Sequence, residues 1–176
     1  NKIGWKANDR WGREAVFYKK INWNKVALKQ KRPVGEWIKL GIKPVQKISA
    51  LESQTEAKLI MPTGHKGPKF LVYENFDKIM KWNNSTLYAL SVGLLSDMLK
   101  DKDFKLYAKN NQEKISKKDI EKIQLILSRQ GYYKGQADGV LGSNTRKGIQ
   151  AYQKRKGLPQ DGYPSVQLMK KLAREK

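Results

Sequence analysis

The first candidates for acid–base chemistry in this chain are its 16 carboxylates. Enzymes that cleave glycosidic bonds depend on such groups, because a carboxyl must donate a proton to the leaving oxygen. Glu14 and Glu36 lie close to tryptophans in the sequence, and an apolar neighbour of this kind raises the pKa of a carboxyl group. The alternative for both is a solvated charge on the face of a strand or helix.

The chain has one histidine and no cysteine. His65 lies in the glycine-rich segment 63–68 and is predicted to be a turn residue, since no second histidine is present for a metal site or a catalytic triad. The lack of cysteine excludes disulfide scaffolds, zinc fingers and thiol nucleophiles.

Basic residues outnumber acidic residues by 37 to 16, which gives a formal net charge of +21. This diffuse charge favours attraction to nucleic acid, anionic lipid or a carboxylate-bearing cell wall; an ordinary surface of solvated lysines is the alternative. No helix-turn-helix, RNA-binding sheet or zinc-finger motif is present, so no specific nucleic-acid partner is predicted. No segment approaches the ~20 apolar residues of a membrane span, so no transmembrane segment is predicted.

The tryptophans gather in the first part of the chain. Indole rings stack on sugars, which would suit a glycan groove, but they also pack in hydrophobic cores. Four lie within the first 37 residues and one lies near the start of a predicted helix: Trp5, Trp11, Trp23, Trp37 and Trp82.

Residues 1–100 show the patterns of an α+β region with a small sheet. Three apolar runs predict strands, of which the last two should form a hairpin: residues 11–18, 58–62 and 69–73. A short helix is predicted at 35–40 and a longer one at 85–99, with Ser85 as its N-cap. The longer helix is apolar on nearly all sides, which is typical of a helix contacted from several directions.

Residues 117–176 predict a compact all-α module, which follows a polar linker at 101–116. Ser116 and Asp119 form a capping box at the start of its first helix. An Asp-Gly pair precedes each of the next two helices, a weak internal duplication, and we expect φ > 0 at Gly139 and Gly162. The three helices should pack on six apolar side chains: Ile123, Leu127, Ile149, Tyr152, Leu168 and Leu172.

Residues 118–172 resemble the peptidoglycan-binding type 1 module. The resemblance rests on a spaced pattern that includes Gly131-Tyr132, Asp138-Gly139, Thr145, Gln153, Gly157-Leu158 and Asp161-Gly162. It implies a three-helix bundle that binds cell-wall glycan or stem peptide. The candidate binding residues of this module are Tyr133, Asp138, Thr145, Gln153 and Asp161.

Residues 1–100 resemble the end of the catalytic domain of B-type lytic murein transglycosylases. The order and spacing of the motifs carry the resemblance: Gly4-Trp5, Trp11-Gly12-Arg13-Glu14, Trp37-x2-Leu40-Gly41, the segment 62–70, and Asn75-Phe76 leading to 82–90. In that family the last piece belongs to a lysozyme-like fold and lines the glycan groove. The resemblance therefore implies that Trp82, Asn83 and Tyr88 contact substrate, with Trp82 standing where the family has tyrosine.

The implied reaction is non-hydrolytic cleavage of the β-1,4 bond between N-acetylmuramic acid and N-acetylglucosamine, with closure of a 1,6-anhydro ring. One glutamate serves first as acid and then as base, and the resemblance implies neither a metal ion nor an organic cofactor. In the family this glutamate lies in a Gly-Tyr-Gly…Glu-Ser context, which no glutamate here has. We therefore expect it upstream of Asn1, this chain alone to be inactive, and its partners to be peptidoglycan and the missing N-terminal part of the same protein, in a bacterial periplasm or cell envelope.

Two other functions remain as alternatives, a non-catalytic cell-wall-binding protein and a basic nucleic-acid binder. If the N-terminal part of the catalytic domain is missing from this chain, the helix 85–99 lacks part of its packing surface. We then expect an exposed apolar patch on this helix, around Tyr88 and Val92, larger than the few hundred Å² normal for a monomer. Full burial of that helix by this chain would favour the self-sufficient wall-binding protein.

Overall fold

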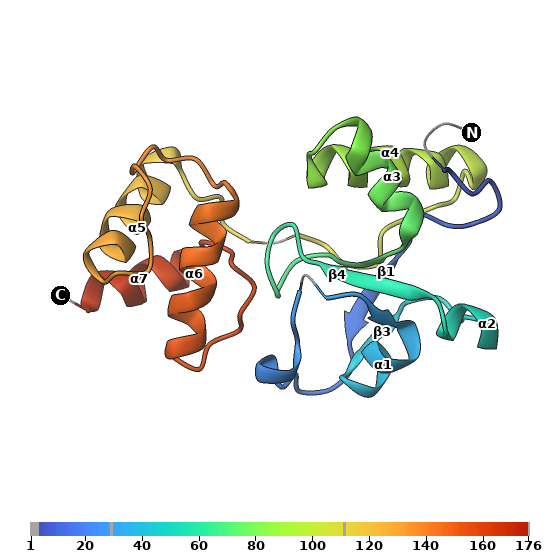
Figure 1. Ribbon diagram of the computed structural model, residues 1–176, viewed down its shortest axis with the longest axis horizontal. Helices are drawn as coiled ribbons and strands as arrows, with labels where there is room; N and C mark the ends of the chain where they lie inside the picture. Colours follow the sequence, from blue (N-terminus) through green and yellow to red (C-terminus); the bar gives the residue numbers. More distant parts are fainter. Residues whose placement is uncertain (1–3, 29, 111, 176) are drawn as a thin grey trace. The chain divides into compact units, whose positions relative to one another are not determined.

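The computed structural model describes residues 4–28, 30–110 and 112–175 (Figure 1). The fold is α+β, and the chain forms two compact units. One unit contains the chain up to Pro62 together with Gly67–Lys109, and the other contains Thr63–Lys66 and Asn110–Lys176. None of the described helices has the length and apolar character needed to cross a membrane.

An antiparallel sheet of five strands forms the centre of the first unit, in the order β2-β4-β5-β1-β3. The strands are β1 Gly12–Phe17, β2 Arg32–Pro33, β3 Ile42–Pro44, β4 Glu56–Ile60 and β5 Lys69–Val72. The pairing of Leu59 with Leu71 confirms the predicted hairpin. Strands β2 and β3 are not predicted from the sequence, because strands of two and three residues are too short to show an alternating pattern.

Both faces of this sheet are buried, because successive residues of β5 point to opposite sides. Leu71 packs in a core with Trp37 of α1 (Val34–Lys39), whose indole N–H donates to the carbonyl of Ala57 at 2.9 Å. Phe70 and Val72 pack with the pair α3 (Glu74–Trp82) and α4 (Thr86–Lys100). Figure 1 shows α1 and the α3–α4 pair on opposite sides of the sheet. Two short elements, η1 (Trp23–Lys25) and α2 (Ala50–Ser53), complete the unit.

Helix α3 is the longest element that is not among the predicted ones. It begins without a side-chain hydrogen bond at its N-cap. Tertiary contacts hold it instead: Asn75 is fully buried, and its side-chain amide donates to the carbonyls of Lys6 and Asp9, both at 2.8 Å. A local signal exists, because the apolar Phe76 and Ile79 stand at helical spacing and the acidic Glu74 and Asp77 lie in the first turn, but without an N-cap residue the start of the helix is not marked.

Helix α4 is buried on one side only. Ser85 caps it as predicted by accepting the N–H of Tyr88, and Ala89, Leu90 and Gly93 are buried. Five large apolar side chains on the other side are exposed, and we call them the α4 apolar face: Leu87 (64%), Tyr88, Leu95, Met98 and Leu99 (78%). The predicted exposed face is present, but Val92 is partly buried against the sheet. Its inclusion in the patch is therefore wrong.

Three helices form the second unit: α5 (Lys117–Arg129), α6 (Ser143–Arg155) and α7 (Val166–Arg174). The capping box of Ser116 and Asp119 is present, and all six predicted core side chains are buried together. Gly139 and Gly162 have φ of 69° and 65°, as predicted. Between 101 and 116, the described residues form neither helix nor strand.

Candidate functional site

The three predicted substrate contacts lie at the corner where α3 ends and α4 begins. Trp82 is the last residue of α3 and is 78% exposed, and Asn83 is its exposed C-cap. Tyr88 lies in the first turns of α4 and is 39% exposed. The carbonyl of Asn83 accepts the N–H of Ser85 at 2.7 Å, which fixes the corner. All three side chains are accessible to a ligand.

The two carboxylates that lie near tryptophans in the sequence, Glu14 and Glu36, do not form a catalytic pair. Glu14 accepts the backbone N–H groups of Tyr107 and Ala108, each at 2.7 Å, so it anchors the segment that follows α4. Glu36 is exposed on α1. Glu36 is therefore a solvated charge on a helix face, the alternative given above. Glu14 instead anchors a distant segment, a role that its local sequence does not indicate.

Other carboxylates of the first unit are held ionised by basic neighbours. Burial alone would raise the pKa of Glu52, but its contact with Arg13 and the hydroxyl that Tyr73 donates at 2.9 Å lower it below the ordinary value. Hydrogen bonds and ion pairs with two lysines lower the pKa of Glu74 to about 2. A group that is ionised at neutral pH cannot act as the general acid.

The tryptophans divide between core and surface. Trp11 is buried; its indole N–H donates to Asp97 at 2.9 Å and its ring lies so close to Gly93 that a Cβ there would stand 2.3 Å from it. Trp37 is also a core residue. Trp5 and Trp82 are exposed. Trp23 is half-buried and packs against the core that contains Trp37. The core interpretation therefore holds for Trp11 and Trp37, whereas Trp5 and Trp82 are the two rings most open to stacking on a sugar.

In the second unit, the first Asp-Gly turn is held by a buried glutamine. Gln124 donates its side-chain N–H to Asp138 Oδ1 at 2.9 Å and accepts the N–H of Gly139 at 2.8 Å. Asp138 Oδ1 also accepts the N–H of Val140 at 2.9 Å. The Val140 amide and the Gln124 side chain lower the pKa of Asp138, so this carboxylate is ionised at neutral pH.

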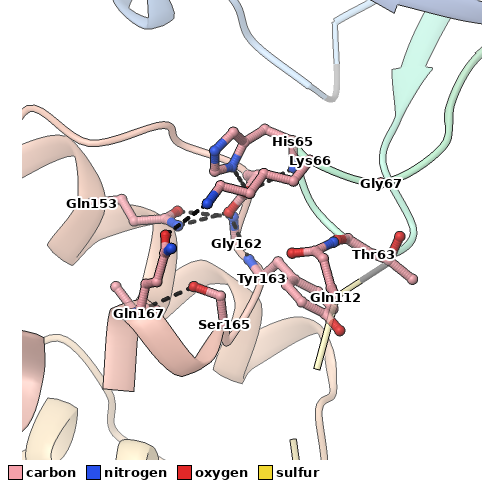
Figure 2. Close-up of polar contacts among 12 residues, drawn as sticks. Thr63, His65, Lys66, Gly67, Gln112, Gln153, Gly162, Tyr163, Ser165 and Gln167 are labelled. Carbon is pink, nitrogen blue, oxygen red and sulfur yellow. Dashed lines mark hydrogen bonds and ion pairs between the residues drawn. The ribbon is translucent and has the colours of Figure 1, made fainter. Parts of the chain in front are cut away.

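The second Asp-Gly turn repeats this arrangement (Figure 2). Gln153 donates to Asp161 Oδ1 at 2.7 Å and accepts the N–H of Gly162 at 2.9 Å. The other oxygen, Asp161 Oδ2, contacts the backbone nitrogen of His65 at 2.8 Å and its Nδ1 at 2.6 Å. Burial alone would raise the pKa of Asp161, but the bonds from His65, Tyr163 and Gln153 lower it below the ordinary value.

The five predicted binding residues of this module therefore differ in accessibility. Tyr133, Thr145, Gln153 and Asp161 are buried and hydrogen-bonded inside the unit. Asp138 is exposed. The burial of the other four indicates that they hold the two turns, so Asp138 is the member of the set that a ligand can reach directly.

A cavity of about 300 Å³ opens beside the second turn, in the unit that contains residues 63–66. Its wall includes His65, Ser165 and Lys170, and a hydrogen bond of 2.8 Å joins Lys66 Nζ to Gln167 Oε1 there. In the described part of the chain, no three His, Asp or Glu side chains gather as the ligands of a metal ion.

Residues 1–97 match the family described as transglycosylase SLT domain. The chain belongs to the SLT transglycosylase family. Residues 116–172 match the family described as peptidoglycan binding domain. No curated protein matches the chain.

Two solved structures are similar to this chain along nearly its whole length. They are crystal structures of SltB3 from Pseudomonas aeruginosa, one in complex with NAG-anhNAM-pentapeptide and one with NAG-NAM-pentapeptide. The first is 36% identical with a TM-score of 0.82 and covers 98% of this chain and 47% of that one; for the second the values are 37%, 0.82, 97% and 46%. The chain thus spans about half the length of SltB3.

Sequence reasoning misses two residues of the polar networks, Gln124 and His65. The internal duplication offers a signal for Gln124, because Gln124 and Gln153 each precede an Asp-Gly pair in the sequence. Each glutamine also lies seven residues after a basic residue, Lys117 or Arg146. His65 is 96 residues from Asp161, so its local sequence indicates a turn and nothing more.

Proposed function

We propose that this chain is part of a lytic transglycosylase that cleaves the β-1,4 bond between N-acetylmuramic acid and N-acetylglucosamine and forms 1,6-anhydro products. The observation that carries the proposal is the SLT domain match over residues 1–97. The likeness to SltB3 supports it, because one SltB3 structure contains an anhydro sugar, NAG-anhNAM-pentapeptide. The chain thus belongs to the family, and a similar structure contains a compound of the kind that the proposed reaction would form.

In this proposal the α3–α4 corner forms part of the glycan groove. Asn83 offers an amide that can bond to sugar hydroxyl and acetamido groups, Tyr88 offers a hydroxyl, and Trp82 offers a ring for stacking. Their exposure supports the assignment, since each can reach a ligand without rearrangement of the sheet.

We place the catalytic acid/base glutamate outside this chain. A general acid of this type needs a carboxyl whose pKa is raised by an apolar environment. Among the described carboxyls, those of Glu52, Glu74, Asp77 and Asp161 have lowered pKa values instead. The exposed α4 apolar face also supports the proposal, because an apolar surface of this kind suits contact with further protein.

The peptidoglycan binding domain would hold the enzyme on its polymeric substrate in the periplasm or cell envelope. The net charge of +21 assists, since peptidoglycan carries carboxylates. Non-catalytic wall binding is the second candidate function. One observation favours it: the helices α5–α7 share a core of their own, with seven buried apolar side chains, as expected of a binding domain that folds without the rest of an enzyme.

The test compares this chain with the full-length protein encoded by its gene. We expect both to sediment with insoluble peptidoglycan, and only the full-length protein to release 1,6-anhydro-muropeptides detectable by mass spectrometry. In the full-length protein, Asn83→Ala should lower the release rate, whereas Asn84→Ala, its exposed neighbour, serves as the control. Release of anhydro products by this chain alone would contradict the placement of the glutamate.

A further inference from the structure

The two Asp-Gly turns of the second unit are copies of one hydrogen-bonded arrangement. In each, a buried glutamine donates to Oδ1 of the aspartate and accepts the N–H of the following glycine. In each, the same Oδ1 accepts the N–H of the residue after the glycine, at 2.9 Å. We call these arrangements clamp 1, on Asp138, and clamp 2, on Asp161.

The similarity between the two turns includes their contact with the helices that carry the glutamines. A Cβ added to Gly139 would stand 2.7 Å from the carbonyl oxygen of Lys117, and one added to Gly162 would stand 3.0 Å from that of Arg146. Lys117 and Arg146 each lie seven residues before the glutamine of their clamp. Each turn therefore rests on the same part of its helix, and both aspartates are fixed in the same way.

The clamps differ at the second carboxylate oxygen. In clamp 2, Asp161 Oδ2 contacts two nitrogens of one residue, the backbone nitrogen and Nδ1 of His65, and Asp161 is buried. In clamp 1, Asp138 is exposed, and among the described residues no ion pair or hydrogen bond is found at its Oδ2. Clamp 2 thus holds an intramolecular ligand, and clamp 1 presents the same acceptor to solvent.

We propose that Asp138 Oδ2 binds the peptide part of peptidoglycan, through a residue that offers a peptide N–H and a second nitrogen donor, as His65 does to Asp161. A diamino acid of a stem peptide has both, a peptide N–H and a side-chain ammonium. The sugars offer hydroxyl groups and single acetamido N–H groups, but no such pair on one unit. The inference rests on the proposed wall-binding function and names the ligand of that domain.

The surroundings of clamp 1 suit this ligand. The carboxylate does not need to be ordered on binding, because Gln124 and the Val140 amide already hold Oδ1, and pre-ordering of this kind reduces the cost of association. A charged acceptor strengthens each N–H bond that it receives. The side chain of Val140 is exposed directly beside the turn and can pack against the apolar part of a peptide.

The test measures sedimentation of the chain with insoluble peptidoglycan and, in parallel, with glycan from which an amidase has removed the peptides. Asp138→Asn keeps the shape and Oδ1 but replaces an acceptor oxygen by an NH₂ group. Glu121→Gln is the matched control, since Glu121 is an exposed carboxylate of α5 in the same domain. We expect D138N to weaken binding to intact peptidoglycan about tenfold, the loss of one charge-assisted bond, and E121Q to leave it unchanged.

On peptide-free glycan, D138N and the unchanged chain should bind alike. A weakening of equal size on both polymers would overturn the peptide assignment, and an unchanged affinity of D138N for intact peptidoglycan would overturn the role of Asp138 while leaving wall binding intact. Failure of the unchanged chain to bind either polymer would overturn the proposed function itself. If D138N does not fold, the unchanged chain decides the matter: a soluble stem peptide must shift the amide NMR signals of Gly139 and Val140, and absence of a shift contradicts the proposal.

Discussion

The helices of the two units differ in how completely their apolar faces are covered. In the second unit, α5, α6 and α7 share one core, and the large apolar side chains that stay exposed, Leu125 and Val140, belong to different segments. In the first unit, α4 buries one side against the sheet and leaves the α4 apolar face open along most of its length. The second unit is therefore complete as a folded domain, whereas α4 retains a surface for further contacts.

The largest expected effect comes from opening the core of the complete unit. Leu172→Ala removes a fully buried side chain and should lower the free energy of unfolding of the second unit by about 2–5 kcal/mol. Hydrogen exchange of the Ile123 and Tyr152 amides measures the free energy of unfolding of this unit. All five tryptophans lie within the first 82 residues, so tryptophan fluorescence follows the first unit separately. Leu125→Ala, at an exposed site of the same domain, is the control, and an equal loss there would contradict the comparison.

A smaller effect should follow from removing one glutamine. Gln153→Ala leaves the buried Asp161 and the N–H of Gly162 without the partners that Gln153 provides, and an unsatisfied buried polar group costs about 1–3 kcal/mol. The same hydrogen-exchange experiment measures the loss. Gln136→Ala, an exposed glutamine of the same unit, should change the exchange rates little. Equal effects of the two variants would mean that clamp 2 does not stabilise the domain.

The second unit should also lose stability in acid. The pKa of Asp161 is lower in the folded state than in the unfolded chain, so its contribution is complete above the unfolded pKa and is lost as the pH falls through the folded pKa. The expected window therefore lies below about pH 4. Urea unfolding of the second unit at pH 3 and pH 6 measures the change. Asp161→Asn should show a smaller difference between the two pH values, and an unchanged difference would refute the assignment.

The smallest effect is expected on the α4 apolar face. Leu95→Ser exchanges an exposed apolar side chain, and substitutions at such sites usually change stability by less than about 0.5 kcal/mol. The tryptophan-monitored unfolding transition should therefore stay in place, while binding of a hydrophobic dye falls. A loss of about 2 kcal/mol or more would show that Leu95 belongs to a core of this chain, and the contrast between the units would disappear.

Much of the second unit can be predicted from the sequence, because its determinants are local. The capping box at Ser116, the helix start at Ser165 and the two glycines with positive φ are all encoded within a few residues. The six core positions follow from helical periodicity. The hairpin β4–β5 and the start of α4 at Ser85 are local in the same sense.

The remaining features depend on contacts between distant residues. The start of helix α3 is held by Asn75, which is buried against the backbone near Lys6 and Asp9. The contact of His65 with Asp161 joins residues 96 positions apart. The resemblance named Tyr133, Thr145, Gln153 and Asp161 as binding residues, but their burial is a three-dimensional property that no spacing in the sequence indicates.

The bond from Glu14 to the amides of Tyr107 and Ala108 has a consequence for which substitutions these positions can accept. The carboxylate contacts the main chain of both residues, so the contact does not depend on their side chains. Proline is the residue that it excludes there, because proline has no N–H to donate. Position 14, in contrast, must present two acceptor oxygens at a fixed reach. The contact therefore restricts position 14 to a residue with two acceptor oxygens, whereas positions 107 and 108 can accept any residue except proline.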